Sequence, residues 1–222
     1  MQRNPADLAF CAPERPSIRD FNAEARIPFG VSIEHVCQAM VDFTDFLETV
    51  NTELARKQMA RLEDMLMPAG FSSMVGEFIV SNLPKHCPGI VKNNYHNGHP
   101  DLLPAGRYAG DAAQQAGSDG IEVKGSRYLK AWQGHNPEDA WLMVFVFESS
   151  RPSDALKGRE RICFRFLGVY GAQLQKVDWQ FAGRSQMSRR TITATVLPSG
   201  FEKMKQNWIY EAPIQRSNSK PS

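Results

Sequence analysis

The chain has 222 residues, of which 42% are hydrophobic and 23% are charged, and its formal net charge is +2. This composition supports one packed core and excludes general disorder. The sequence shows no charged segment followed by an apolar signal region, and no run of about 18 apolar residues. Secretion and membrane insertion are therefore not expected, and we expect a cytoplasmic protein.

The four cysteines give no sign of a metal site or a disulfide framework. They are Cys11, Cys37, Cys87 and Cys163, and no two of them form a CxxC pair. Scattered cysteines of this kind are typical of reduced thiols in a cytosolic protein.

Charge is distributed unevenly along the chain. Residues 151–222 hold 13 Lys/Arg and 5 Asp/Glu, a balance of +8, whereas residues 1–150 hold the remaining 13 and 19, a balance of −6. A basic C-terminal third suits a polyanionic partner, because basic side chains neutralise phosphates.

The N-terminal part predicts an irregular arm and then a long helix. Residues 1–30 are rich in proline and polar residues, and Ser32 is a candidate N-cap. Apolar residues then recur at three- and four-residue steps to about Met67. One interpretation is that this segment forms one or two helices packed on the domain's own sheet. The other gives residues 33–66 a role in dimerisation.

The rest of the chain predicts alternating helices and strands. A second helix is expected from Phe71 to Leu83, stopping before Pro84. A last helix is expected from a Ser199 cap through Trp208. Strands are expected over 89–94, 120–126, 140–147, 162–169 and 191–196. We therefore predict an α/β fold with a mixed central sheet flanked by helices, divided into an N-terminal arm and long helix (1–67), a core (68–214) and a flexible tail (215–222).

Three charged residues point to a candidate catalytic site. In the expected strand over 120–126, Glu122 and Lys124 share one face while Ile121 and Val123 face a core, since side chains alternate along a strand. Asp101, in the preceding segment GHPDLLP, can supply a second carboxylate. Two carboxylates can hold Mg²⁺, and a nearby lysine can orient water or offset charge on phosphorus. The alternative is that these residues are solvated surface charges on a sheet edge.

This pattern resembles the PD-(D/E)xK nuclease superfamily. The matching residues are Pro100-Asp101 and Glu122-Val123-Lys124, on either side of a loop over 104–119. The resemblance implies a restriction-endonuclease-like core in which Asp101 and Glu122 bind Mg²⁺, the Val123 carbonyl adds a ligand, and Lys124 helps the attacking water. It also suggests that Glu77, on the preceding helix, reaches the metal; the alternative is a glutamate on the helix surface.

Two histidines raise a different possibility. His96 and His99 could suggest an HNH nuclease or a zinc site. An HNH site needs a partner on a helix further along the chain, and only His135-Asn136 is present, after a strand and a turn. His99 is better interpreted as a loop residue near the site, in contact with phosphate.

Basic and amide side chains suggest two groups of DNA contacts. The first comprises Arg184, Gln186, Arg189 and Arg190, residue types that bind base edges and phosphates. The second comprises Arg127, Tyr128, Lys130 and Trp132, which directly follow the motif strand. Ordinary solvated loops would carry the same residue types.

Together these features predict a Mg²⁺-dependent endonuclease acting on double-stranded DNA. A short chain of this kind most resembles a Type II restriction enzyme, which would act as a homodimer on a palindrome. Two alternatives are a structure-specific nuclease of the same superfamily in repair, recombination or phage DNA processing, and a non-catalytic DNA-binding protein on the same fold.

Overall fold

A computed structural model describes residues 11–134, 136–154, 157–159, 161–182 and 193–213. Its strands form a six-stranded sheet, in the order β1-β2-β3-β5-β6-β9, and a three-stranded sheet, in the order β4-β8-β7. The helices are α1 (Ile33–Arg56), α2 (Leu62–Met65), α3 (Pro68–His86) and α4 (Pro198–Gln206). The strands are β1 (Ile90–Lys92), β2 (Leu102–Pro104), β3 (Ile121–Ser126), β4 (Gln133–Gly134), β5 (Ala140–Glu148), β6 (Arg165–Leu174), β7 (Trp179–Ala182), β8 (Thr193–Val196) and β9 (Trp208–Glu211).

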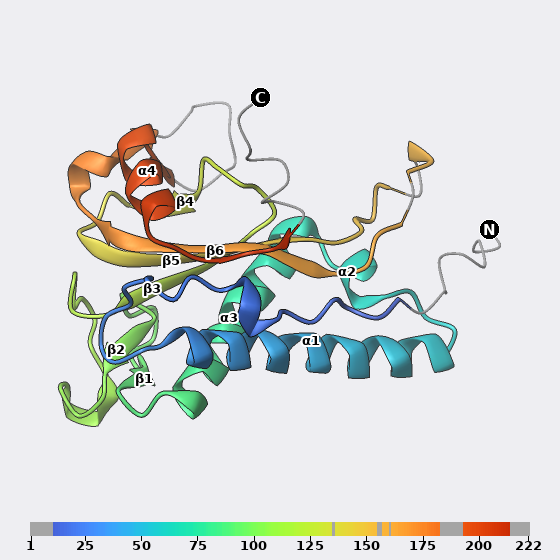
Figure 1. The fold of residues 1–222 in the computed structure, drawn as a ribbon, viewed down its shortest axis with the longest axis horizontal. Coiled ribbons are helices and arrows are strands. Elements are labelled where there is room, and N and C mark those ends of the chain that lie inside the picture. The colour runs from blue at the N-terminus through green and yellow to red at the C-terminus, as the bar shows by residue number, and fades with distance from the viewer. Residues whose placement is uncertain (1–10, 135, 155–156, 160, 183–192, 214–222) are drawn as a thin grey trace.

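The large sheet is mixed, and it is covered on both faces. β3 and β5 are parallel, whereas the other neighbouring pairs are antiparallel. Figure 1 shows α1 and α3 on one side of β5 and β6, with α4 on the other. The predicted α/β class with a mixed central sheet flanked by helices is therefore confirmed.

β5 is apolar from Ala140 to Phe147 because each of its faces contacts a separate core. Trp141, Met143, Phe145 and Phe147 belong to the core beneath α1 and α3. The alternate residues Leu142, Val144 and Val146 pack with residues of α4 and the small sheet. A strand buried on both faces reads as a continuous hydrophobic run, and this explains why β5 was predictable.

The long helix α1 begins where the sequence indicated but ends earlier. Ser32 is its N-cap, with the Ser32 side chain accepting from His35 N–H. A single helix to about Met67 is wrong, and the alternative of two helices is confirmed: α1 stops at Arg56, Gln58 adopts a left-handed backbone conformation, and α2 follows. The chain then turns back, so that Leu62 N–H donates to the side chain of Asn51.

The apolar stripe of α1 lies inside the protein. Val36, Met40, Phe43 and Leu47 are buried in the core that α1 shares with α3 and the sheet. This confirms the interpretation in which the helix packs on its own sheet. A further role of residues 33–66 in dimerisation stays a prediction.

The boundaries of the two later helices also differ from expectation. α3 starts at Pro68, a suitable residue for the first helical position because the backbone N–H there has no partner within the helix. The helix then continues through Pro84 to His86. Ser199 is not the N-cap of α4, which begins at Pro198; the Ser199 hydroxyl instead donates to Asp178. α4 ends at Gln206, before β9.

Two further expectations are corrected. β6 spans Arg165–Leu174, later than the predicted 162–169. The expectation of four reduced thiols is wrong for two of them, because Cys11 and Cys163 form a disulfide between the N-terminal segment and the start of β6. The backbone at Glu14, which pairs with Arg165, brings these two segments together. Cys37 and Cys87 are free and buried.

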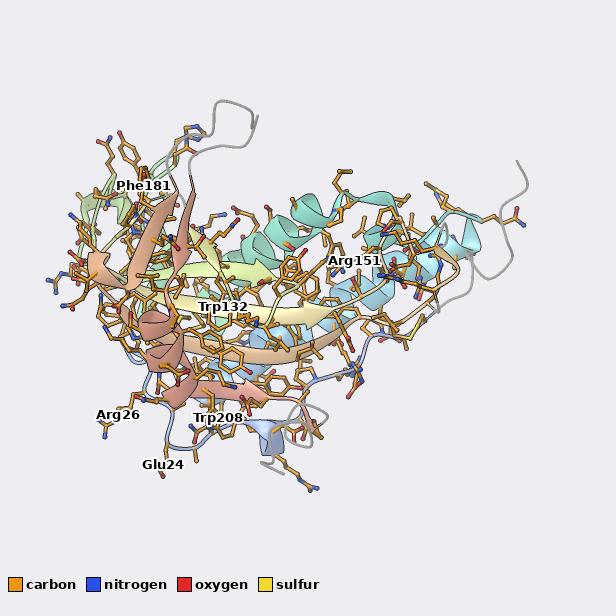
Figure 2. All side chains as sticks on the ribbon, turned by 90° about the horizontal axis from the view of Figure 1, so that it is seen from above. Glu24, Arg26, Trp132, Arg151, Phe181 and Trp208 are labelled. Atoms are coloured by element: carbon orange, nitrogen blue, oxygen red, sulfur yellow. A yellow bond between two sulfur atoms is a disulfide. The ribbon has the colours of Figure 1, made fainter. Side chains whose placement is uncertain are left out.

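Figure 2 distinguishes interior from peripheral aromatic side chains on the small-sheet side of the molecule. Trp132 lies among the strands, where it is buried and stacks on Tyr170. Phe181 lies at the periphery and is 51% exposed. Within the described part of the chain, no helix has the length and apolar character needed to span a membrane.

Candidate active site

Strand register brings the two halves of the sequence motif together. In the antiparallel pairing of β2 with β3, Leu102 lies opposite Ile121. The residue before Leu102 is therefore adjacent to the residue after Ile121, and Asp101 meets Glu122 although about twenty residues separate them in sequence.

A hydrogen bond fixes Asp101 on the motif strand. Its Oδ2 accepts from the backbone N–H of Val123 at 2.9 Å. The two backbone groups of a strand residue point to the same side, so the Val123 carbonyl also faces away from β5. That carbonyl oxygen lies near α3, since a β-carbon built on Gly76 would be 3.8 Å from it.

Both carboxylate oxygens of Glu122 have partners from basic residues. Lys124 Nζ donates to Oε1, as expected for two residues on the same face of β3. His99 Nδ1 lies 3.0 Å from Oε2. The side chains of Glu122 and His99 are only 12% and 14% exposed, so these contacts are largely shielded from water.

Glu138 adds a second carboxylate to His99. Its Oε2 lies 2.7 Å from His99 Nε2, so the imidazole bridges Glu122 and Glu138. The parallel pairing of β3 with β5 explains this contact: Ile121 lies beside Trp141, which places the segment before β5 next to the start of β3.

Burial and neighbouring charges shift the pKa values of these groups in different directions. Burial, followed by the negative charge of Glu122, raises the pKa of Asp101 above its usual range. Burial alone would raise the pKa of Glu122, but the His99 hydrogen bond and the Lys124 charge lower it. Burial would lower the pKa of His99, but Glu122 and Glu138 raise it to about 9.

The same residues line one large cavity. Its volume is about 1020 Å³, and its walls come from α3, from the loop over 92–99 and from residues near β4 and β7. Asp101, Glu122 and Lys124 all line it. Polar groups converging in a concave site are the usual form of a catalytic or binding site.

Glu77 lies on the α3 wall of this cavity. Its side chain is 71% exposed, and Oε2 is 3.5 Å from Lys92 Nζ. Its negative charge contributes to the raised pKa of Asp101, so it acts on the motif carboxylate electrostatically. Its predicted role as a metal ligand stays a prediction.

Glycine allows α3 to approach the motif strand closely. A β-carbon at Gly125 would lie 2.4 Å from the carbonyl oxygen of Ser72 on α3. A side chain at this position would therefore push the helix away from β3. Because Gly125 has no side chain, α3, which forms one wall of the cavity, can lie close to the motif residues on β3.

The donor atoms in this site are of the kind that Mg²⁺ prefers. Asp101 and Glu122 offer carboxylates, and Val123 offers a carbonyl that the β3–β5 ladder does not use. Among the described residues, no group of three or more His, Cys, Asp or Glu is arranged to hold a metal ion. Two carboxylates and one carbonyl still fit Mg²⁺, because this ion usually keeps several waters and binds substrate oxygens.

The residues predicted to contact DNA have different positions in the fold. Lys130 is exposed, but Trp132 is buried, so its placement in a DNA-facing group is wrong. Arg127 packs its guanidinium over the rings of Phe71 and Phe147 and donates to the Ser149 carbonyl. This inward position does not favour a phosphate contact by Arg127, although the role itself stays a prediction.

The other four predicted DNA contacts cannot be placed. Arg184, Gln186, Arg189 and Arg190 lie outside the described residues.

Sequence reasoning missed Glu138 altogether. This residue stands in a turn-rich segment with no motif around it, and only the parallel pairing of β3 with β5 brings it to His99. A usable signal was its place just before the central strand that follows the motif strand. Polar residues at the same end of neighbouring parallel strands lie close together.

The chain was compared with protein-family models, curated proteins and solved structures, and none of them matches it.

Proposed function

We propose that this protein is a Mg²⁺-dependent endonuclease of the PD-(D/E)xK type that hydrolyses DNA phosphodiester bonds. The main support is the hydrogen bond from Val123 N–H to Asp101, which joins the two halves of the motif. Glu122 and Lys124, which share a face of β3, line the same cavity as Asp101. A carboxylate pair and a lysine in one cavity match the chemical needs of metal-assisted hydrolysis.

Each residue has a distinct proposed role. Asp101 and Glu122, together with the Val123 carbonyl, would hold the metal. Bound Mg²⁺ would polarise the phosphate and lower the pKa of a coordinated water. Lys124 would orient the attacking water and offset negative charge that develops on the phosphate. Its pKa is raised because the charges of Glu122 and Asp101 outweigh the effect of burial, so it stays protonated at neutral pH.

We further propose that the substrate is double-stranded DNA, cut at a specific sequence by a homodimer, as in Type II restriction enzymes. The basic balance of residues 151–222 supports a polyanionic substrate. Two-fold symmetry of the protein would match that of a palindromic site. Light scattering with and without DNA tests this: a species near twice 24.9 kDa supports the dimer, and a persistent monomer contradicts it.

Digestion of mixed DNA tests the activity itself. Wild-type protein with Mg²⁺ should cut, and protein with EDTA should not. Discrete fragments would support a restriction enzyme, whereas smears or cutting only at junctions would support a structure-specific nuclease. Asp101→Asn serves as the matched inactive control, because an amide keeps the shape of the side chain but not its charge.

One observation favours a non-catalytic DNA-binding protein as a second candidate. Both oxygens of Glu122 already have protein partners, Lys124 and His99. Glu122 therefore has a partner at each oxygen without a metal. DNA binding that persists without cleavage in Mg²⁺ or Mn²⁺ would support this candidate over the nuclease.

A cytoplasmic location is part of the same proposal, because a restriction enzyme meets its DNA inside the cell. The disulfide between Cys11 and Cys163 is unusual for that compartment. Thiol labelling of protein isolated directly from cells distinguishes the cases. Two labelled thiols would show that the disulfide is present, which would count against a reducing location, whereas four would support it.

A further inference from the structure

His99 contacts one of the two carboxylate oxygens through which Glu122 could bind a metal. Its Nδ1 lies 3.0 Å from Glu122 Oε2, while Lys124 takes the other oxygen of the same carboxylate. Asp101 likewise has one oxygen engaged, by Val123 N–H. A metal that binds Glu122 therefore competes with these two donors for the lone pairs of the carboxylate. Lys124 belongs to the same strand as Glu122, whereas His99 approaches from the neighbouring loop.

Glu138 gives His99 a place to remain once Glu122 is released. The 2.7 Å contact between His99 Nε2 and Glu138 is on the opposite side of the imidazole from Glu122. The backbone of His99 is held independently, since its N–H donates to Gln114 and its carbonyl accepts from Ala116. Breaking the contact with Glu122 therefore need not disturb the loop.

We propose that His99 is a positioning residue that holds Glu122 in the metal-free protein and competes with the metal for its Oε2 atom, and that Glu138 retains the imidazole when Glu122 binds the metal. This inference rests on the proposed function, because it assumes that Glu122 is a metal ligand. It assigns a role to two residues outside the sequence motif. It also explains how a largely buried carboxylate stays partnered before metal arrives.

Calorimetric titration with Mn²⁺ in the absence of DNA tests the inference without relying on activity. His99→Ala should bind Mn²⁺ about tenfold more tightly than wild type, equivalent to about 1.4 kcal/mol, because a competing hydrogen bond to a charged group is removed. His96→Ala is the matched control, since this histidine lines the same cavity and should leave the affinity unchanged. Circular dichroism establishes that the variants are folded.

Glu138→Gln should weaken Mn²⁺ binding, because His99 then depends more on Glu122. In the His99→Ala background the same substitution should have much less effect, so the two residues should show coupling in a double-mutant cycle. If Glu138→Gln weakens Mn²⁺ binding equally in both backgrounds, Glu138 does not act through His99. If His99→Ala does not fold, His99→Gln replaces it, with a smaller gain expected.

The outcomes separate this inference from the proposed function. If the wild type binds Mn²⁺ and His99→Ala binds it equally or more weakly, His99 does not compete with the metal. That result would overturn this inference and leave the nuclease proposal intact. Binding by His99→Ala but not by wild type would support the inference strongly. No binding by any variant would overturn both proposals.

Discussion

Asp101 Oδ2 accepts a hydrogen bond from the backbone N–H of Val123, 22 positions further along the chain. Val123 stands between Glu122 and Lys124, so this one bond fixes Asp101 relative to both charged side chains of the motif strand. It also uses a backbone donor at the edge of β3, where β2 pairs only at Ile121. The Asp101 carboxylate thus bonds to a backbone N–H at the edge of the sheet.

Asp101→Asn should separate the structural role of this residue from its charge. The amide oxygen can still accept from Val123 N–H, so the melting temperature should stay close to that of wild type. Asp101→Ala loses the acceptor and should be less stable by about 1–3 kcal/mol. Both variants should lose Mn²⁺ binding in calorimetry. Unchanged metal affinity in Asp101→Asn would remove Asp101 from the ligand set.

Lys124→Ala should reduce cleavage by at least about 100-fold, since a preorganised positive charge near the phosphate is lost. DNA binding at moderate salt should change little, because one half-buried lysine contributes little to the overall charge. Lys157→Ala, which removes an exposed lysine, is the control and should cut normally. Cleavage assays and electrophoretic binding assays measure the two effects. A Lys124→Ala variant that cuts at the wild-type rate would exclude this lysine from the chemistry.

The central part of the site was predictable because it depends on short-range patterns. Alternation along one strand placed Glu122 and Lys124 on the same face, and the apolar run of β5 marked the neighbouring strand. The N-cap at Ser32 was equally local. Features that depend on residues close together in sequence, such as a strand face or a helix cap, can be predicted from the sequence alone.

The remainder depends on pairings that no local pattern encodes. Glu138 reaches His99 only through the parallel pairing of β3 with β5, and Cys11 reaches Cys163 through a backbone pairing across most of the chain. Trp132 follows a basic segment in sequence, but it turns back to stack on Tyr170. Each of these errors treated a long-range contact as absent.

Gly125→Ala should disturb the site through packing. The new β-carbon would lie 2.4 Å from the Ser72 carbonyl, so α3 must shift away from β3. We expect a loss of about 1–3 kcal/mol in unfolding free energy, typical of overpacking, together with reduced cleavage. Gly70→Ala, on α3, is the control. Nothing lies within 4 Å of a β-carbon at Gly70, and alanine favours helix. Equal stability of the two variants in urea unfolding would contradict the close approach.

The last prediction concerns the pH dependence of stability near the small sheet. The Asp178 carboxylate accepts from Lys203 Nζ at 2.6 Å, from Gln175 N–H at 2.9 Å and from the Ser199 hydroxyl at 3.1 Å. Burial would raise the pKa of Asp178, but these donors, above all Lys203, lower it below the usual value. The carboxylate should therefore stabilise the fold above its unfolded pKa of about 3.9, and this contribution should be lost as pH falls through the lower folded value.

Asp178→Asn should accordingly be less stable than wild type by about 1–3 kcal/mol near neutral pH. The difference should shrink as the pH falls below about 4, because wild-type Asp178 then takes up a proton and loses the same charge. Urea unfolding at a series of pH values measures both quantities. Glu202→Gln, at an exposed position on α4, is the control and should change stability little at any pH. A difference for Asp178→Asn that is equally large in acid would show that its cause is packing rather than the charge of the carboxylate.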